Sequence, residues 1–202
     1  MIPWRLRFSG VRDYTPTEMD LSDKDDHILI SGPNGAGKST VTFCMGGVLY
    51  SSKVDIEGLK SNNLPSDQTW RAKIELLFKN DGEVKVDAPL YVQFRLDIEQ
   101  KPGDPVKKEF YIEEGDVIDQ WQRSTKFSSG GNLNFSEYKN LVLYKYAVDP
   151  DEFYLIWYQK EVNQFAVMHT EERFRIFSEM NGIDKIQKNW EQSKELVKET
   201  EQ

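Results

Sequence analysis

The chain has 202 residues, of which 38% are apolar and 12% aromatic, enough to build one domain with a sizeable core. Its 34 acidic and 26 basic residues give a formal charge of −8, which argues against a broad surface that coats nucleic acid but leaves room for a local basic strip. With a single cysteine, the chain cannot form an internal disulfide. It contains no run of about eighteen apolar residues, so no membrane span is predicted. The start of the chain lacks the apolar stretch of a signal peptide, so we expect a cytoplasmic protein.

Two short strands are predicted at the start of the chain. Residues Trp4 to Phe8 alternate between apolar and charged side chains, as in a half-buried strand. The segment Gly10 to Tyr14 then leads to a second strand near Met19 to Leu21. The strand that precedes the first recognisable motif is therefore not the first strand of the fold.

Residues 31–40 read SGPNGAGKST and match the phosphate-binding pattern G-x-x-x-x-G-K-[ST]. The pattern needs a strand before it and a helix after it, and both are predicted, at 27–31 and at about 39–50. Backbone N–H groups of such a loop turn inward together to bind phosphates, and glycine enters the required positive-φ conformations at low cost. The alternative, a bare glycine turn, is disfavoured by the correct flanks. We therefore predict a P-loop.

Each position of this P-loop has an expected role. Lys38 would reach the β- and γ-phosphates, and the hydroxyl of Ser39 would bind Mg²⁺. The helix N-terminus adds unsatisfied N–H groups and the positive end of its dipole. No Asn-Lys-x-Asp element is present to read guanine, so the expected nucleotide is ATP. The remaining predicted nucleotide contacts in the loop are Pro33, Asn34, Gly35, Ala36, Gly37 and Thr40.

The hydrophobic period changes to two after a polar loop at 51–67. An antiparallel lobe at about 68–115 is predicted, with charged outer faces and with Asn80-Asp81-Gly82 as a hairpin turn. Its expected strands are Trp70 to Phe78, Val84 to Val86, Leu90 to Leu96 and Glu109 to Ile112.

Residues 122–136 are polar and contain glycine, which predicts a loop. Within it, Ser128-Ser129-Gly130-Gly131 is similar to the signature motif of ABC ATPases, but its flanking residues differ from that motif. Leu141 to Tyr144 followed by Asp149 has the outline of a Walker B strand, but Lys145 interrupts it before the acids. We reject both interpretations, because such short matches arise easily.

The remainder of the chain is predicted to be mostly helical. An amphipathic helix is expected from Ser136 to Ala147, and the apolar run Phe153 to Tyr158 has the length of a strand. Thr170 is a suitable cap for a helix that Asn181-Gly182 would end. A further helix, Asp184 to Gln202, carries apolar residues at the spacings of a coiled coil.

Taken together, these stretches resemble the N-terminal half of an SMC-type ATPase head, the family of structural-maintenance-of-chromosomes proteins and of DNA-repair relatives such as SbcC and RecN. The matching pieces are Gly10-Val11-Arg12-Asp13-Tyr14, GPNGAGKST, the antiparallel lobe, and YQKEVNQF (158–165) followed by EERFRIFSEMNGID (171–184). The resemblance implies an α/β P-loop NTPase fold with a mixed sheet, an antiparallel β lobe and a C-terminal helix that starts a coiled coil. It places the half-head at 1–168 and the helical root of the coiled coil at 169–202.

The resemblance also implies roles for two residues outside the P-loop. Arg12 would lie near the nucleotide phosphates, and Gln159 would complete the site of Mg²⁺ and the attacking water. Lys38 and Gln159 would then be the catalytic residues of this chain, with Ser39 and Gln159 on the metal. Lys160 departs from the family, which has glycine there. The alternative for Arg12 and Gln159 is an ordinary surface role.

Family members carry their signature serine and Walker B acids in a C-terminal half, and no convincing version occurs here. This chain is therefore expected to bind ATP but to hydrolyse it poorly by itself. The implied partners are the C-terminal half of the same head, a second head in an ATP-dependent dimer, DNA, and a nuclease or accessory subunit, with no membrane. The implied function is DNA repair, chromosome maintenance or anti-phage defence, in association with the nucleoid in a bacterium.

Two other functions remain open from the sequence. A standalone P-loop phosphotransferase acting on a small metabolite would need a lid with several arginines, and the candidate lid at 122–136 holds only Arg123 and Lys126. A nucleotide-independent assembly module would use the head only to support the coiled coil. Loss of ATP binding with retained folding on substitution of Lys38 would exclude the assembly module, and metabolite-dependent turnover would favour the phosphotransferase.

Overall fold

The computed structural model describes residues 1–22, 30–82, 85–151 and 165–180, together with Ile183, Trp190 and Lys194. The chain divides into two compact units, 1–150 and 151–202. In chain order, the elements are β1 (Ile2–Ser9), β2 (Thr17–Asp20), α1 (Lys38–Val48), the 3₁₀ turn η1 (Glu57–Leu59), β3 (Trp70–Lys79), β4 (Tyr91–Gln100), β5 (Lys107–Gly115), β6 (Arg123–Ser128), α2 (Phe135–Asn140), the π-helical turn η2 (Leu141–Lys145) and α4 (Thr170–Met180).

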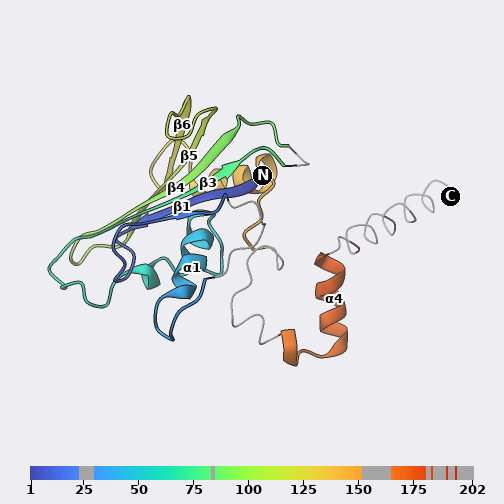
Figure 1. Cartoon of the computed structure of the whole chain (residues 1–202), viewed down its shortest axis with the longest axis horizontal. Helices are drawn as coiled ribbons and strands as arrows, with labels where there is room; N and C mark the ends of the chain where they lie inside the picture. The colour runs from blue at the N-terminus through green and yellow to red at the C-terminus, as the bar shows by residue number, and fades with distance from the viewer. Residues whose placement is uncertain are drawn as a thin grey trace. The chain divides into compact units, whose positions relative to one another are not determined.

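The strands of the first unit form one six-stranded sheet in the order β2-β1-β3-β4-β5-β6. Every neighbouring pair is antiparallel, and β1 (blue in Figure 1) lies beside β3, so the lobe includes the N-terminal strands as well as 68–115. These are the strand pairs of the described residues, and the apolar run Phe153 to Tyr158, expected to be a further strand of a mixed sheet, lies outside them. Most of these strands are joined by short connections, which favour antiparallel pairing, whereas a parallel pair needs a long crossover. The expected strand at 27–31 falls largely outside the described residues.

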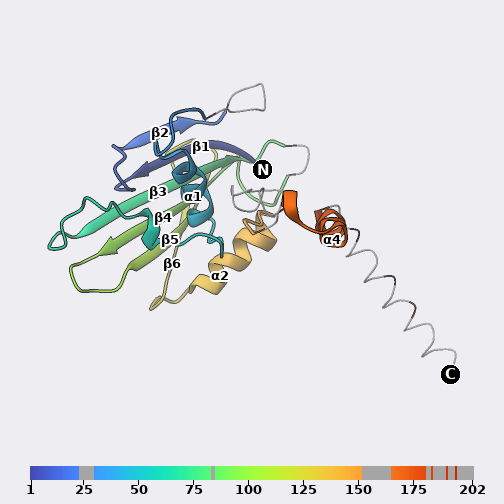
Figure 2. The same cartoon turned by 90° about the horizontal axis from the view of Figure 1, so that it is seen from below.

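One face of the sheet carries the hydrophobic core. Figure 2 shows the strands side by side with α1 and α2 against this face, and both helices contact the strands there. Tyr138 of α2 is fully buried, with ring centroids 4.6 Å from Phe110 and 5.3 Å from Phe127. Its hydroxyl donates to the carbonyl oxygen of Val48, the last residue of α1, at 2.6 Å. Tyr138 therefore ties the two helices to each other and to the sheet.

Strand β6 corrects the expectation of a loop at 122–136. It pairs with β5 from Glu109 opposite Ser128 to Glu114 opposite Arg123. Phe127 is its one buried residue, at 0% exposure. An edge strand with a single buried apolar side chain has almost no alternation to detect, so the tertiary pairing with β5 decides its conformation.

The expected strand at 84–86 is also incorrect where the structure describes it, because Val86 lies in the loop between β3 and β4. Asn80, which is 5% exposed, organises this loop. Its side-chain amide donates to the carbonyl oxygens of Val86 and Ala88 at 2.9 Å each, and its Oδ1 accepts from the Val86 N–H at 3.1 Å. The polar side chain thus satisfies backbone groups that a strand would pair with its neighbour.

Leu141–Lys145 form a π-helical turn that continues α2, which confirms the expected helix near 136–147 and excludes a Walker B strand there. Asn134 caps α2 in a capping box with Glu137. In the second unit, α4 spans Thr170–Met180 as expected and has two acidic residues in its first turn. The predicted helix 184–202 and Gln159 lie outside the described residues. None of the helices in the described part of the chain is both long and apolar enough to cross a membrane.

The other face of the sheet is charged, as predicted for the lobe. Arg95 of β4 donates to Glu113 of β5 at 2.5 Å, and its guanidinium lies 3.8 Å from the centroid of the Tyr111 ring. Arg7 of β1 pairs with Glu18 of β2 at 2.5 Å. These pairs join neighbouring strands across the sheet, and each adds a modest contribution to strand pairing. Because these arginines are paired with acids, the face does not form a basic strip.

Glu109 lies on this charged face, and its ion pair with Lys126 is expected to contribute to the stability of the fold at neutral pH and to be lost in acid. The hydrogen bond from Lys126, at 2.9 Å, together with Lys107 and Tyr111, lowers the pKa of Glu109 from 4.5 to about 2 despite desolvation. A depressed folded-state pKa contributes stability above about pH 4.5 that is lost as the pH falls toward 2. Lys126→Met should raise the Glu109 pKa, measured by carboxyl NMR, and should flatten the loss of unfolding free energy between pH 5 and 2.

The control for this prediction is Lys101→Met, which removes an exposed lysine from the turn between β4 and β5. It should leave the pKa of Glu109 unchanged. Equal pKa values of Glu109 in wild type and Lys126→Met would contradict the assignment.

Candidate nucleotide-binding site

Residues 31–37 form a loop, exposed over 31–36, that ends at the start of α1. Gly35 and Gly37 have φ values of 83° and 84°, in the left-handed region that glycine occupies most readily. The Ala36 N–H donates to the Pro33 carbonyl at 3.2 Å and the Thr40 N–H donates to the Gly37 carbonyl at 2.7 Å. A Cβ added at Gly35 would meet no atom within 4 Å, so the loop is open on that side. The two glycines therefore adopt the positive-φ conformations that a phosphate-binding loop uses.

The N-terminus of α1 follows the P-loop directly and brings the positive end of its dipole to it. Its N-cap, Gly37, makes no side-chain cap hydrogen bond, and no acidic residue occupies the first turn. A helix start with these properties keeps its N–H groups and dipole end available for phosphate. Ser39 is exposed in this turn, whereas Thr40 is fully buried.

Lys38 is folded over the first half of the loop. Its ammonium donates to the carbonyl oxygens of Gly32 at 2.8 Å and Pro33 at 2.7 Å. Both acceptors are neutral, and a lysine ammonium binds an anionic phosphate oxygen more strongly than a neutral carbonyl. The side chain is therefore placed to exchange these bonds for a phosphate.

Arg12 reaches the P-loop from the turn that follows β1. Its Nη1 donates to the Thr40 hydroxyl at 3.1 Å, and its Nε donates to the Gly58 carbonyl at 3.2 Å. Its own backbone N–H donates to the carbonyl oxygen of Leu59 at 2.7 Å, and its φ of 45° lies in the left-handed region. The guanidinium is thus held beside the first turn of α1, between the P-loop and η1.

Tyr14 is a further side chain at the loop, and the sequence did not single it out. Its hydroxyl donates to the Ala36 carbonyl at 3.2 Å. Its ring makes an edge contact with the ring of Phe8, with centroids 5.2 Å apart. The only signal in the sequence was its membership of the Gly10 to Tyr14 element.

The residues present fit ATP with Mg²⁺. The loop supplies backbone N–H donors, Lys38 and Arg12 supply positive charge, and the exposed Ser39 hydroxyl is a metal ligand of the required kind. Mg²⁺ at such sites takes most of its other ligands from phosphate and water. Burial raises the pKa of Cys44 to about 12, so this thiol stays protonated and takes no part. Gln159 lies outside the described residues.

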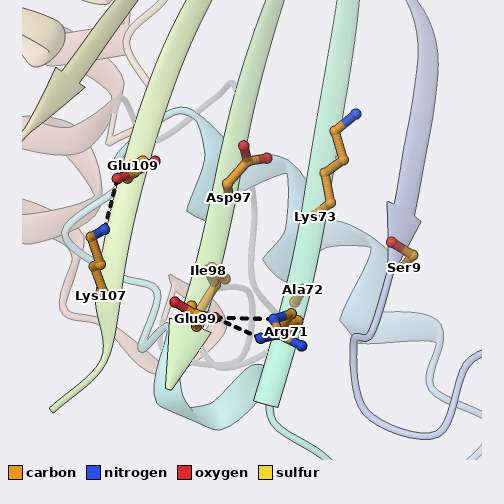
Figure 3. A pocket seen from close by; sticks show the side chains of 9 residues that line it. All are labelled: Ser9, Arg71, Ala72, Lys73, Asp97, Ile98, Glu99, Lys107 and Glu109. Atoms are coloured by element: carbon orange, nitrogen blue, oxygen red, sulfur yellow. Dashed lines mark hydrogen bonds and ion pairs between the residues drawn. The ribbon is translucent and has the colours of Figure 1, made fainter. Parts of the chain in front are cut away.

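A depression of about 350 Å³ on the charged face of the sheet is shown in Figure 3. Arg71 pairs there with Glu99 at 3.0 Å, and Lys107 pairs with Glu109 at 3.1 Å. Burial raises the pKa of Asp97 against the opposing effect of Arg95. The lining charges largely neutralise one another, so this depression selects a phosphate less well than the P-loop.

A glycine loop with a lysine at the start of a helix, set beside an antiparallel sheet, defines a P-loop nucleotide-binding domain. The family model described as "AAA domain" matches residues 5–202, and the chain belongs to this family. No protein of curated function matches the chain.

A solved structure from a study of the ATP-driven dimerization and DNA stimulated activation of SMC ATPases is similar to this chain. The TM-score is 0.57 at 18% sequence identity, and the match covers 89% of this chain and 99% of that chain. At this identity the likeness concerns the fold. It confirms the expected α/β fold of an SMC-type ATPase head.

Proposed function

We propose that the chain is the ATP-binding half of an SMC-like ATPase head, with residues 1–168 as the half-head and 169–202 as the root of a coiled coil. The observation that carries this proposal is the convergence of three cationic or donor groups on one glycine loop. These groups are the Lys38 ammonium, the uncapped N-terminus of α1 and the Arg12 guanidinium.

Binding of ATP begins with the loop. The triphosphate displaces the Gly32 and Pro33 carbonyls from Lys38, and the loop N–H groups donate to its oxygens. The Ser39 hydroxyl would hold Mg²⁺, which would neutralise part of the phosphate charge. Arg12 moves its Nη1 from the Thr40 hydroxyl to a phosphate oxygen, an exchange that again replaces a neutral acceptor by an anion. In this proposal Gln159 positions the attacking water.

Hydrolysis needs groups that this chain does not supply. The general base and the signature serine are proposed to come from the C-terminal half of the same head and from a second head, which close over the γ-phosphate. Closure is favoured only while the γ-phosphate bridges the two heads, so hydrolysis reopens them. The study of the similar structure concerns ATP-driven dimerization and DNA stimulation, which supports this scheme and a role in DNA repair, chromosome maintenance or defence, with nuclease or accessory subunits.

The position of its candidate lid disfavours a small-metabolite phosphotransferase. Its candidate lid contained Arg123 and Lys126, and both lie on strand β6, paired with β5. A strand held in a sheet cannot close over a P-loop as a mobile lid does.

The whole chain is expected to bind ATP and to turn it over slowly. Calorimetric titration should give saturable binding of ATP that is strengthened by Mg²⁺, because Ser39 and the phosphates share the metal. Phosphate release should be on the order of 10⁻³ s⁻¹ or slower, as for P-loop proteins that lack a completing residue. Absence of ATP binding would contradict the proposal, and so would rapid hydrolysis by the chain alone. Turnover that depends on a metabolite would favour the phosphotransferase instead.

A further inference from the structure

We infer that Tyr14 is a positioning residue for the P-loop, which holds one backbone N–H donor toward the phosphates. The inference rests on the proposed function, because it concerns the same nucleotide site. Among the described residues, the Tyr14 side chain hydrogen-bonds to the carbonyl of Ala36, the loop residue just before Gly37.

The hydrogen bond of Tyr14 fixes the orientation of one peptide plane. The Tyr14 hydroxyl donates to the Ala36 carbonyl oxygen at 3.2 Å. In a planar trans peptide, the carbonyl of Ala36 and the N–H of Gly37 point in opposite directions. Because the carbonyl is held on the tyrosine side, the N–H of Gly37 points away from the ring, toward the other side of the loop. The donor is therefore oriented before any ligand arrives, which lowers the ordering cost of binding.

The ring of Tyr14 also sets the position of Gly37. A Cβ at Gly37 would lie 2.7 Å from the Tyr14 Cε2 and hydroxyl oxygen, closer than real contacts allow. Gly37 is therefore favoured by its φ of 84°, and a side chain there would also have to displace the end of the Tyr14 ring. Gly37 and the Tyr14 ring are therefore in close contact, in addition to the hydrogen bond that Tyr14 makes to Ala36.

Tyr14 is itself fixed by the core of the sheet. Its ring meets Phe8, which is 2% exposed, at an interplanar angle of 79°. Its N–H donates to the Val11 carbonyl at 3.1 Å, which closes the turn after β1. Trp70 of β3 anchors the start of this turn by donating its indole N–H to the Gly10 carbonyl at 2.8 Å. These contacts with β1 and β3 fix Tyr14, and Tyr14 in turn holds the P-loop at Ala36.

The test is Tyr14→Phe in the whole chain, which removes the hydroxyl and keeps the ring. ATP and inorganic tripolyphosphate are titrated separately, because tripolyphosphate reports the phosphate cradle alone. We expect both affinities to fall by about 3- to 10-fold, the equivalent of one hydrogen bond. The melting temperature should change little, since the ring still packs on Phe8. Tyr14→Ala, which also removes the support under Gly37, should weaken both ligands further.

Tyr111→Phe is the matched control, because it removes one tyrosine hydroxyl, hydrogen-bonded to Glu109 at 3.0 Å, on the charged face of the sheet. It should leave both affinities unchanged. In ¹⁵N-glycine-labelled protein without nucleotide, the Gly37 amide resonance should move in Tyr14→Phe and stay in place in Tyr111→Phe. A merely structural tyrosine would lower the melting temperature without changing affinity or this resonance, and that result overturns the inference.

Failure of this inference can be distinguished from failure of the proposed function. Wild type that binds neither ATP nor tripolyphosphate contradicts both. Wild type that binds them, together with Tyr14→Phe that binds them equally well, overturns only the role of Tyr14.

Discussion

Replacement of Lys38 by alanine is expected to weaken ATP binding by roughly 10- to 100-fold, the loss of one hydrogen-bonded charge on the phosphates. The fold should survive, because among the described residues the Lys38 ammonium donates to the carbonyl oxygens of Gly32 and Pro33, which lie on an exposed loop. Calorimetry measures the affinity, and circular dichroism with thermal unfolding measures the fold. The protection that ATP gives against thermal unfolding should fall in parallel with the affinity.

Lys85→Ala is the matched control for the charge. Its side chain is 64% exposed and lies 3.8 Å from Asp81, in the loop between β3 and β4. That loop follows the end of β3 away from Trp70, whereas the turn that carries Arg12 lies beside Trp70. Equal ATP affinity in Lys38→Ala and wild type would contradict the proposed site. Absence of ATP binding in both proteins would instead support an assembly module in which nucleotide has no part.

Replacement of Gly10 by alanine is expected to lower the free energy of unfolding by roughly 2–4 kcal/mol, through left-handed backbone strain and a steric clash. Gly10 has a φ of 65°, and a Cβ there would lie 1.9 Å from the carbonyl oxygen of Arg71. Relief requires the turn after β1 to move away from β3, which breaks the hydrogen bond from Trp70 to the Gly10 carbonyl. Urea unfolding measures the loss. ATP affinity should fall as well, since this turn carries Arg12 and Tyr14.

Gly103→Ala separates the two causes. Gly103 has a φ of 81° in the turn between β4 and β5, and a Cβ there would meet nothing within 4 Å. It therefore shares the backbone strain of Gly10 without the clash, and we expect a cost of about 1 kcal/mol. Equal unfolding midpoints for the two variants would show that the clash of the added Cβ with the Arg71 carbonyl costs no stability.

The part of the site that is continuous in sequence was predictable. The spacing of Gly32, Gly37 and Lys38 is a local property of the backbone, and the helix that follows begins at Lys38 as the pattern requires. The contacts of Arg12 with Thr40 and of Tyr14 with Ala36 join residues 28 and 22 positions apart. Sequence periodicity carries no information about such pairs. The resemblance pointed to Arg12, and its role in ATP binding, like that of Gln159, stays a prediction.

The sequence by itself determined the elements whose pattern is local and strong. The alternation in β3 and β4, the P-loop and α1 follow from side-chain period and glycine placement, which act within a few residues. The tertiary structure alone decided that Arg123–Ser128 is a strand, that Val86 is not part of one, and that β1 lies between β2 and β3. The physical reason is that edge pairing, buried amide hydrogen bonds and strand order depend on partners distant in the chain, whose free energy no local pattern encodes.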